Sequence, residues 1–214
     1  MMHISIIFML GIFAFCCPAH ANSSECKELS AKLSQSWGWD VPVPCYCGRE
    51  LANLEITPPA GTKVKAVCGL RDTGGRLINL VKEKASLDRY VNGNLPQGSL
   101  YLSGQITYSG VVSFEPGNAG DLWFNTGVTG QPRTPVFRHE FFEEIKLGSA
   151  SDYRKLGMSN PYSEGKPYKC WSKKVTLKIV DPVVHLSDTD FGGTYATDIV
   201  VLKMSASKEF KCYQ

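Results

Sequence analysis

Residues 101–114 read Y-L-S-G-Q-I-T-Y-S-G-V-V-S-F, and this stretch decides the fold. Its first eight residues alternate, so Leu102, Ile106 and Tyr108 lie on one side of an extended chain, as in a half-buried β-strand. Ser109 and Gly110 interrupt the alternation where a bulge or a bend fits, and V-V-S-F continues the strand. The stretch therefore predicts one long strand that turns a corner, as the strands of small barrels do.

The segments that follow this strand predict a β-rich region. K-V-T-L-K-I-V-D (174–181) alternates strongly, and D-L-W-F-N-T (121–126) and T-D-I-V-V-L-K-M-S-A (197–206) also predict strands. Residues 137–147 fit either a helix or a segment ending in a strand, and 152–157 fit one helical turn closed by Gly157. This order is compatible with a small five-stranded OB-like barrel. A plain antiparallel sandwich or an α+β sheet fits it too, so the expected fold class is α+β, mainly antiparallel β.

The segments before the long strand predict a mixture of helices, a strand and turns. Cys26, Leu29, Leu33 and Trp37 recur at helical spacing, which predicts a helix over 23–36. Residues 62–70 alternate as a strand, and the mostly helical spacing of residues 76–90 predicts a helix. Residues 92–98 are rich in turn residues and predict a loop that separates two regions. We therefore expect a disulfide-stapled N-terminal region (22–92) and a β-rich region (93–214), packed together as one globular unit.

The first 21 residues are typical of a secretory signal peptide. Residues 4–17 are apolar and uncharged, and Ala19-His20-Ala21 is a small-x-small pattern suited to cleavage. The apolar block is shorter than the ~20 residues of a membrane span, which argues against a transmembrane anchor. Bulky residues before Cys16 and Cys17 argue against a lipid anchor. We expect an exported chain, periplasmic or extracellular, with no membrane span after cleavage.

Cleavage would leave an even set of cysteines, which favours disulfides in an exported chain. These are Cys26, Cys45, Cys47, Cys68, Cys170 and Cys212. A bond between Cys45 and Cys47 would be strained by the single residue between them. The four early cysteines are therefore predicted to share two bonds, and the two late ones to form the third. One C-x-C without a second pair does not make a zinc site, so no metal and no cofactor is expected.

Composition excludes several classes of function. The chain has 214 residues, is 43% apolar and 20% charged, and carries a net charge of only +3, spread evenly. Nucleic-acid binding is not expected from so small a positive charge. Neither G-x-x-x-x-G-K nor G-x-G-x-x-G occurs, so nucleotide binding has no support either. G-x-S-x-G, the motif around one type of catalytic serine, is also missing.

The nearest approach to a catalytic motif is H-E-F-F-E, residues 139–143. Zinc proteases have a second histidine at the fifth position, where this chain has Glu143. His139 and Glu143, with His185 as a third group, could hold a metal or do acid–base chemistry. An amphipathic segment with a solvated polar face explains the same residues. Likewise, S-D-T-D-F-G-G (187–193) lacks the later ligands of a calcium loop and fits an acidic turn.

The aromatic residues point to binding instead. Trp123 and Asn125 share one face of their predicted strand, and Leu122 and Phe124 share the other. Binding sites are enriched in Trp, Tyr and Arg, although core packing explains many such residues. We expect the ligand on the face that carries Trp123 and Asn125, near Arg138 and His139.

These observations favour an exported, disulfide-stabilised binding protein over an enzyme. Its ligand would be a protein or a component of the cell envelope, and neutralising a toxin or inhibiting a secreted enzyme is one concrete form. The alternatives are an envelope-directed hydrolase that uses His139, Glu143 and His185, and a structural component of the envelope.

Overall fold

The computed structural model describes residues 23–38, 43–51, 58–72, 74–79, 97–114, 122–127, 140–147, 150–158, 170–186 and 193–210. In chain order its elements are α1 (Ser23–Trp37), β1 (Cys45–Cys47), the 3-10 helix η1 (Gly48–Leu51), β2 (Thr62–Arg71), β3 (Gln97–Phe114), β4 (Leu122–Asn125), α4 (Glu140–Glu143), β5 (Glu144–Leu147), α5 (Ala150–Lys155), β6 (Cys170–Val180), β7 (Val183–Leu186), β8 (Gly193–Tyr195), β9 (Asp198–Met204) and β10 (Lys208–Phe210). The predicted fold class, α+β and mainly antiparallel β, is confirmed.

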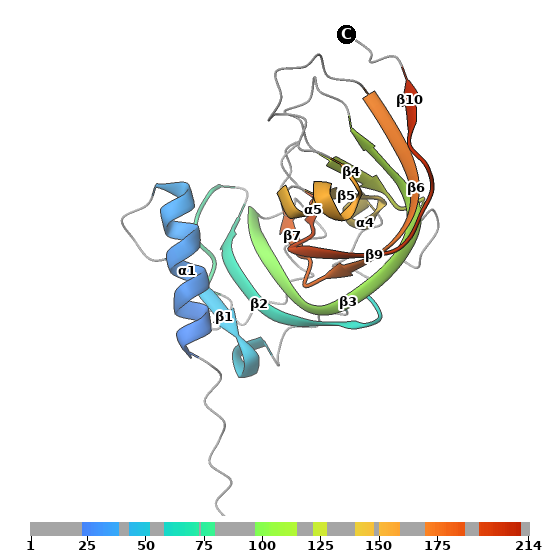
Figure 1. Ribbon diagram of the computed structural model, residues 1–214. Coiled ribbons are helices and arrows are strands. Elements are labelled where there is room, and N and C mark those ends of the chain that lie inside the picture. The colour runs from blue at the N-terminus through green and yellow to red at the C-terminus, as the bar shows by residue number, and fades with distance from the viewer. Residues whose placement is uncertain are drawn as a thin grey trace, which may run out of the picture.

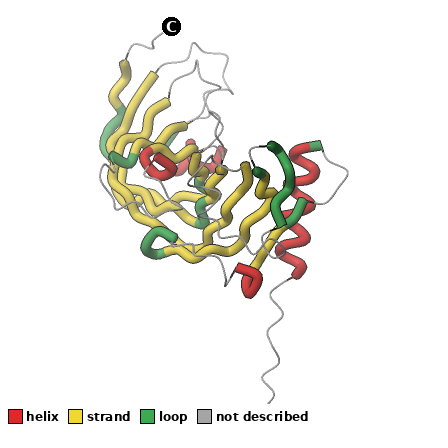
Figure 2. The backbone as a smooth tube through the Cα atoms, turned by 180° about the vertical axis from the view of Figure 1, so that it is seen from behind, coloured by secondary structure: helices red, strands yellow, loops and turns green. Residues whose placement is uncertain are grey.

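Five strands form a closed ring of pairings. β3 pairs with β4, β4 with β5, β5 with β8 and β8 with β7, and β7 returns to β3. Only the β5–β8 pair is parallel. β3 can pair with both β4 and β7, and so close the ring, because it is 18 residues long and strongly curved, as Figure 1 and Figure 2 show. The result is a ring-like partial barrel, in agreement with the OB-like prediction.

The long strand changes partners at Gly104. Residues before it pair with β2 and β7, and residues after it pair with β6 and β4. Gly104 has a φ of 120°, which only glycine adopts readily. Of the bulge or bend predicted at Ser109–Gly110, the bulge is not observed, because β3 pairs with β6 from Gln105 to Phe114 without a register shift. Gly110 instead lets β4 approach closely, since a Cβ there would lie 2.0 Å from the Asn125 carbonyl oxygen.

The core lies inside the ring. Strand residues of alternate parity point inward and are almost completely buried, including Leu102, Phe124, Ile145 and Leu177. The helix α5 adds Tyr153 to this core, and the turn that follows it adds Leu156. Phe114 connects β6 with α5. Its ring stacks on the ring of Trp171, with the ring centroids 6.0 Å apart, and meets the ring of Tyr153 edge-on, with the centroids 6.3 Å apart. Aromatic pairs at these distances contribute stability beyond their buried area.

The N-terminal helix packs on the outside of β1 and β2 (Figure 1). Leu33 of α1 joins Val43, Cys47, Ala66 and Cys68 in a second, smaller apolar cluster. Two disulfides fix this arrangement, Cys26–Cys47 and Cys45–Cys68. The predicted sharing of two bonds among the four early cysteines is thus confirmed. Cys45 and Cys47 point to the same side of β1. Cys47 bonds Cys26 of α1, and Cys45 bonds Cys68 of β2.

Cys170 is fully buried and is also disulfide-bonded. The prediction that it pairs with Cys212 lies outside the described residues. The same holds for the signal peptide at residues 1–21. None of the helices that the structure describes is long and apolar enough to cross a membrane.

Two local predictions are wrong at described residues. The helix predicted over 76–90 does not begin at Arg76, because Leu77 forms an isolated bridge with Arg71 and Ile78 N donates to Leu70 O. Its remainder, from residue 80, lies outside the described residues. Gln97 and Gly98 belong to β3 rather than to a loop. The ambiguous segment 137–147 contains both expected elements, the short helix α4 followed directly by β5.

Candidate functional site

The outer side of β4, β5, β8 and β7 carries a row of partly exposed side chains. Leu122, Phe124, Ile145 and Leu147 fill the inner side and leave the neighbouring positions pointing outward. The outward residues are Trp123 and Asn125 on β4, Glu144 and Lys146 on β5, Tyr195 on β8 and His185 on β7. Trp123 lies opposite Lys146, and Lys146 lies opposite Tyr195, so the three side chains are neighbours across three strands.

Lys146 lies between two aromatic rings. Its Nζ is 5.6 Å from the ring centroid of Trp123 and 5.6 Å from that of Tyr195. At this distance the negative face of an aromatic ring attracts an ammonium group, by about 0.5–1 kcal/mol at an exposed site. The two rings therefore flank the Lys146 ammonium group on the barrel surface and attract it from both sides. We call Trp123, Lys146 and Tyr195 the aromatic row.

His185 extends the aromatic row by one strand. Its imidazole meets the ring of Tyr195 edge-on, with the ring centroids 4.7 Å apart. Its partner across the sheet is Gly193, which has no side chain to cover it. Burial lowers the pKa of His185 below its ordinary value, so the ring is neutral at pH 7. The aromatic row and His185 together thus present two aromatic rings, one imidazole and a single cation.

Asn125 and Glu144 lie opposite each other at one side of the row and are exposed. The side-chain oxygen of Asn125 accepts a hydrogen bond from Gly127 N at 2.9 Å and closes the turn after β4. The structure therefore places Trp123 and Asn125 on one outward face, as the alternation predicts. Arg138 and His139, the other two predicted binding residues, lie outside the described residues.

Of the alternative catalytic residues, Glu143 ends α4 and is exposed, and its carbonyl oxygen accepts from Thr126 N at 2.9 Å. His185 is hydrogen-bonded through Nδ1 to Ser99 Oγ at 2.8 Å. A serine beside a histidine can form a nucleophile and base pair. Ser99, however, is 0% exposed, so no substrate can reach its hydroxyl. The pair orients the imidazole within the sheet.

The sulfur atoms of Cys26, Cys45 and Cys47 lie within 4.8 Å of one another. Such a cluster resembles a set of metal ligands, but a thiolate is needed to bind zinc. All three sulfurs are bonded in the two disulfides, which accounts for their closeness. The cluster is therefore a structural crosslink between α1, β1 and β2.

Comparisons with protein-family models, with curated proteins and with solved structures find no match to this chain.

Sequence reasoning missed Lys146 and Tyr195. A single lysine in E-I-K-L and a tyrosine after G-G-T carry no motif. Their meeting depends on the parallel pairing of β5 with β8, which are almost 50 residues apart in the chain. The only signal in the sequence is the outward parity of Lys146 in a short segment that fits the end of a strand.

Proposed function

We propose that this protein is an exported, disulfide-stabilised binding protein whose ligand, a protein or a cell-envelope component, contacts the aromatic row. The observation that carries the proposal is the partly exposed Lys146 held between Trp123 and Tyr195. None of these three residues belongs to the buried core. Large aromatic rings placed outside a complete core are typical of interaction sites.

The position of the row in the barrel supports the same proposal. β4 and β5 are the second and third strands of the five-stranded ring, counted from β3. Small barrels of the OB type bind their ligands on the face formed by these two strands and on neighbouring loops. Arg138 and His139 precede β5 in the chain and are proposed as further ligand contacts. An inhibitor or toxin-neutralising protein would use such a face.

Two observations support export. The first 21 residues have the composition of a secretory signal. Disulfides such as Cys26–Cys47 and Cys45–Cys68 are typical of oxidising compartments. The proposed location is therefore the periplasm or the extracellular space.

Affinity capture tests the proposed function. Tagged protein is incubated with an envelope and secreted fraction of the source organism, and retained components are identified by mass spectrometry. We expect one component that the W123A and Y195A variants retain at least about tenfold less well, since aromatic residues at the centre of an interface contribute about 2 kcal/mol or more. K63A, which truncates an exposed lysine on β2, is the control and should retain the component as the wild type does.

Equal retention by W123A, Y195A and the wild type would place the binding site elsewhere. Circular dichroism of each variant establishes that a loss of binding does not come from a loss of fold.

A further inference from the structure

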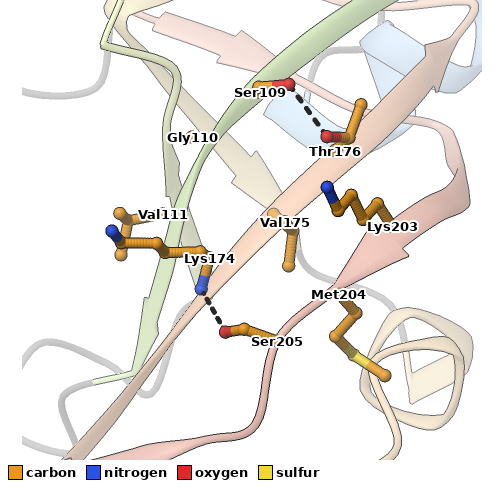
Figure 3. A pocket seen from close by; sticks show the side chains of 9 residues that line it. All are labelled: Ser109, Gly110, Val111, Lys174, Val175, Thr176, Lys203, Met204 and Ser205. Carbon is orange, nitrogen blue, oxygen red and sulfur yellow. Dashed lines mark hydrogen bonds between the residues drawn. The ribbon is translucent and has the colours of Figure 1, made fainter.

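An open groove of about 560 Å³ crosses the surface where β3, β6 and β9 lie side by side. It is separate from the aromatic row, which lies on β4, β5 and β8. Its lining residues are Ser109, Gly110, Val111, Lys174, Val175, Thr176, Lys203, Met204 and Ser205 (Figure 3). We call this surface the lysine groove.

The pairing register explains why polar groups meet in the lysine groove. Ser109 lies opposite Thr176, and Thr176 lies opposite Lys203, so three polar side chains form one row. The Ser109 and Thr176 hydroxyls are hydrogen-bonded at 2.8 Å. Figure 3 shows the Lys203 side chain beside Thr176 and the Lys174 side chain beside Val111. The two lysines thus come from neighbouring strands and lie on the two sides of the groove.

The positive charge of this face is not balanced. Lys174, Lys178 and Lys203 all point outward on β6 and β9, and none of them forms an ion pair with a residue that the structure describes. Asp198, the acidic residue at the start of β9, is already paired with Lys155. An anionic ligand would therefore be attracted to the groove without displacing an existing partner.

Exposed aliphatic side chains lie beside these lysines. Val111, opposite Lys174, is 38% exposed, and Val200, opposite Lys178, is 43% exposed. Burying such side chains contributes roughly 25 cal/mol per Å² of apolar surface removed from water. The nine lining residues include no aromatic side chain on which a sugar ring or a nucleobase could stack. A ligand that matches this surface combines carboxylates with aliphatic groups, as a polypeptide does.

The edge of β9 is not suited to accept another strand. Within the described sheet β9 pairs only with β6, and a register shift leaves Leu202 bulged between Val201 and Lys203. Bulges and lysines on edge strands prevent pairing with other chains. A second copy of this protein would also bring the same lysines together. The partner is therefore expected to lie across the groove rather than to extend the sheet.

We propose that the lysine groove binds an extended acidic segment of a partner protein, with its carboxylates on Lys174 and Lys203 and an aliphatic side chain on Val111. The Ser109 and Thr176 hydroxyls lie beside Lys203, and the one that accepts in their mutual hydrogen bond keeps its own proton to donate to a carboxylate. This contact does not depend on the aromatic row, and the protein can use the two surfaces independently.

Fluorescence anisotropy of a short dye-labelled peptide rich in glutamate and valine tests this proposal. We expect saturable binding to the full protein that weakens as salt rises, because salt screens exposed charges. The variant K174E/K203E should bind about tenfold or more weakly, since it reverses both charges that face the ligand. K174Q/K203Q should be intermediate, and it serves if the double Glu variant folds poorly.

The matched control is K27E/K63E, which changes the net charge equally at two exposed lysines on α1 and β2. It should weaken binding by less than about twofold, because these sites are remote from the groove. Equal weakening by both double variants would mean that only net charge attracts the peptide, and would overturn the proposal. A control peptide has glutamine in place of every glutamate. The proposal is also wrong if this control peptide binds equally well, if no peptide binds, or if only inorganic phosphate or a polyuronate competes for the groove.

Discussion

A methyl group on Gly104 of β3 would lie 2.3 Å from the carbonyl oxygen of Gly61, where β2 begins. The same carbonyl accepts a hydrogen bond from Gln105 N at 3.1 Å. The backbone of the long strand therefore passes β2 at a distance that only glycine allows. This contact lies where β3 leaves β2 and β7 and begins to pair with β6.

The first prediction concerns this contact. G104A should lower the free energy of unfolding by about 3 kcal/mol, because it adds a clash to a φ of 120°. G127A is the control: Gly127 also has a positive φ, of 62°, but a Cβ there meets no atom within 4 Å. It should cost only about 1–2 kcal/mol. Urea unfolding of both variants measures the difference, and equal losses would show that the close contact has no cost.

The second prediction concerns the two disulfides, whose cysteines are 21 and 23 positions apart in the sequence. Replacing Cys45 and Cys68 together by serine should destabilise the protein by about 3 kcal/mol, in line with loops of this length. Peptide mapping without reduction should find Cys26, Cys45, Cys47 and Cys68 in one crosslinked product, because a single residue separates the middle two. Free thiols at these positions would contradict the structure.

The third prediction concerns His185. Its pKa is lowered by burial in the folded chain, whereas the unfolded chain keeps the ordinary value of about 6.5. The unfolded state therefore binds more protons at acidic pH. The contribution of neutral His185 to the free energy of unfolding is complete above pH ~6.5 and is lost as the pH falls below that value. H185Q should flatten this part of the stability profile. Urea unfolding between about pH 7.5 and 5.5 measures both proteins, and parallel profiles would refute the assignment.

The fourth prediction concerns Lys173, which is only 7% exposed and donates from Nζ to the Leu156 carbonyl oxygen at 2.6 Å. K173M keeps most of the side-chain stem but leaves this buried carbonyl without its donor, so it should cost about 1–2 kcal/mol. K174M is the control, because Lys174 is exposed; it should change stability by less than about 0.5 kcal/mol. If both variants melt at the same temperature, Lys173 does not anchor α5 to β6.

Local patterns predicted most of the elements. Alternation in residues 174–181 predicted β6, and Val175, Leu177 and Ile179 are its buried face. The spacing of the cysteines predicted that the four early ones share two bonds and that Cys45 does not bond Cys47, whereas the pairing itself comes from the structure. A buried strand face requires apolar residues at alternate positions, and a disulfide requires two cysteines. Both requirements are visible in the sequence itself.

Features that depend on distant contacts could not be predicted. Nothing in the sequence distinguishes Gly104 from Gly110, because the need for glycine arises from Gly61 in one case and Asn125 in the other. Ser99 and His185 are 86 residues apart. The helical spacing after Arg76 was misleading because Leu77 bridges to Arg71 instead of starting a helix. The meeting of Trp123, Lys146 and Tyr195 depends on three strand registers at once.

The ring of strand pairings has a kinetic consequence. β3 finds its partners both about 30 residues earlier, in β2, and about 70 residues later, in β6 and β7. The ring itself closes only when β8 meets β5. Non-local pairing of this kind slows folding, because chain entropy is lost before the contacts form. The barrel therefore cannot close until the chain as far as β8 is available for pairing, and we expect it to fold in milliseconds to seconds.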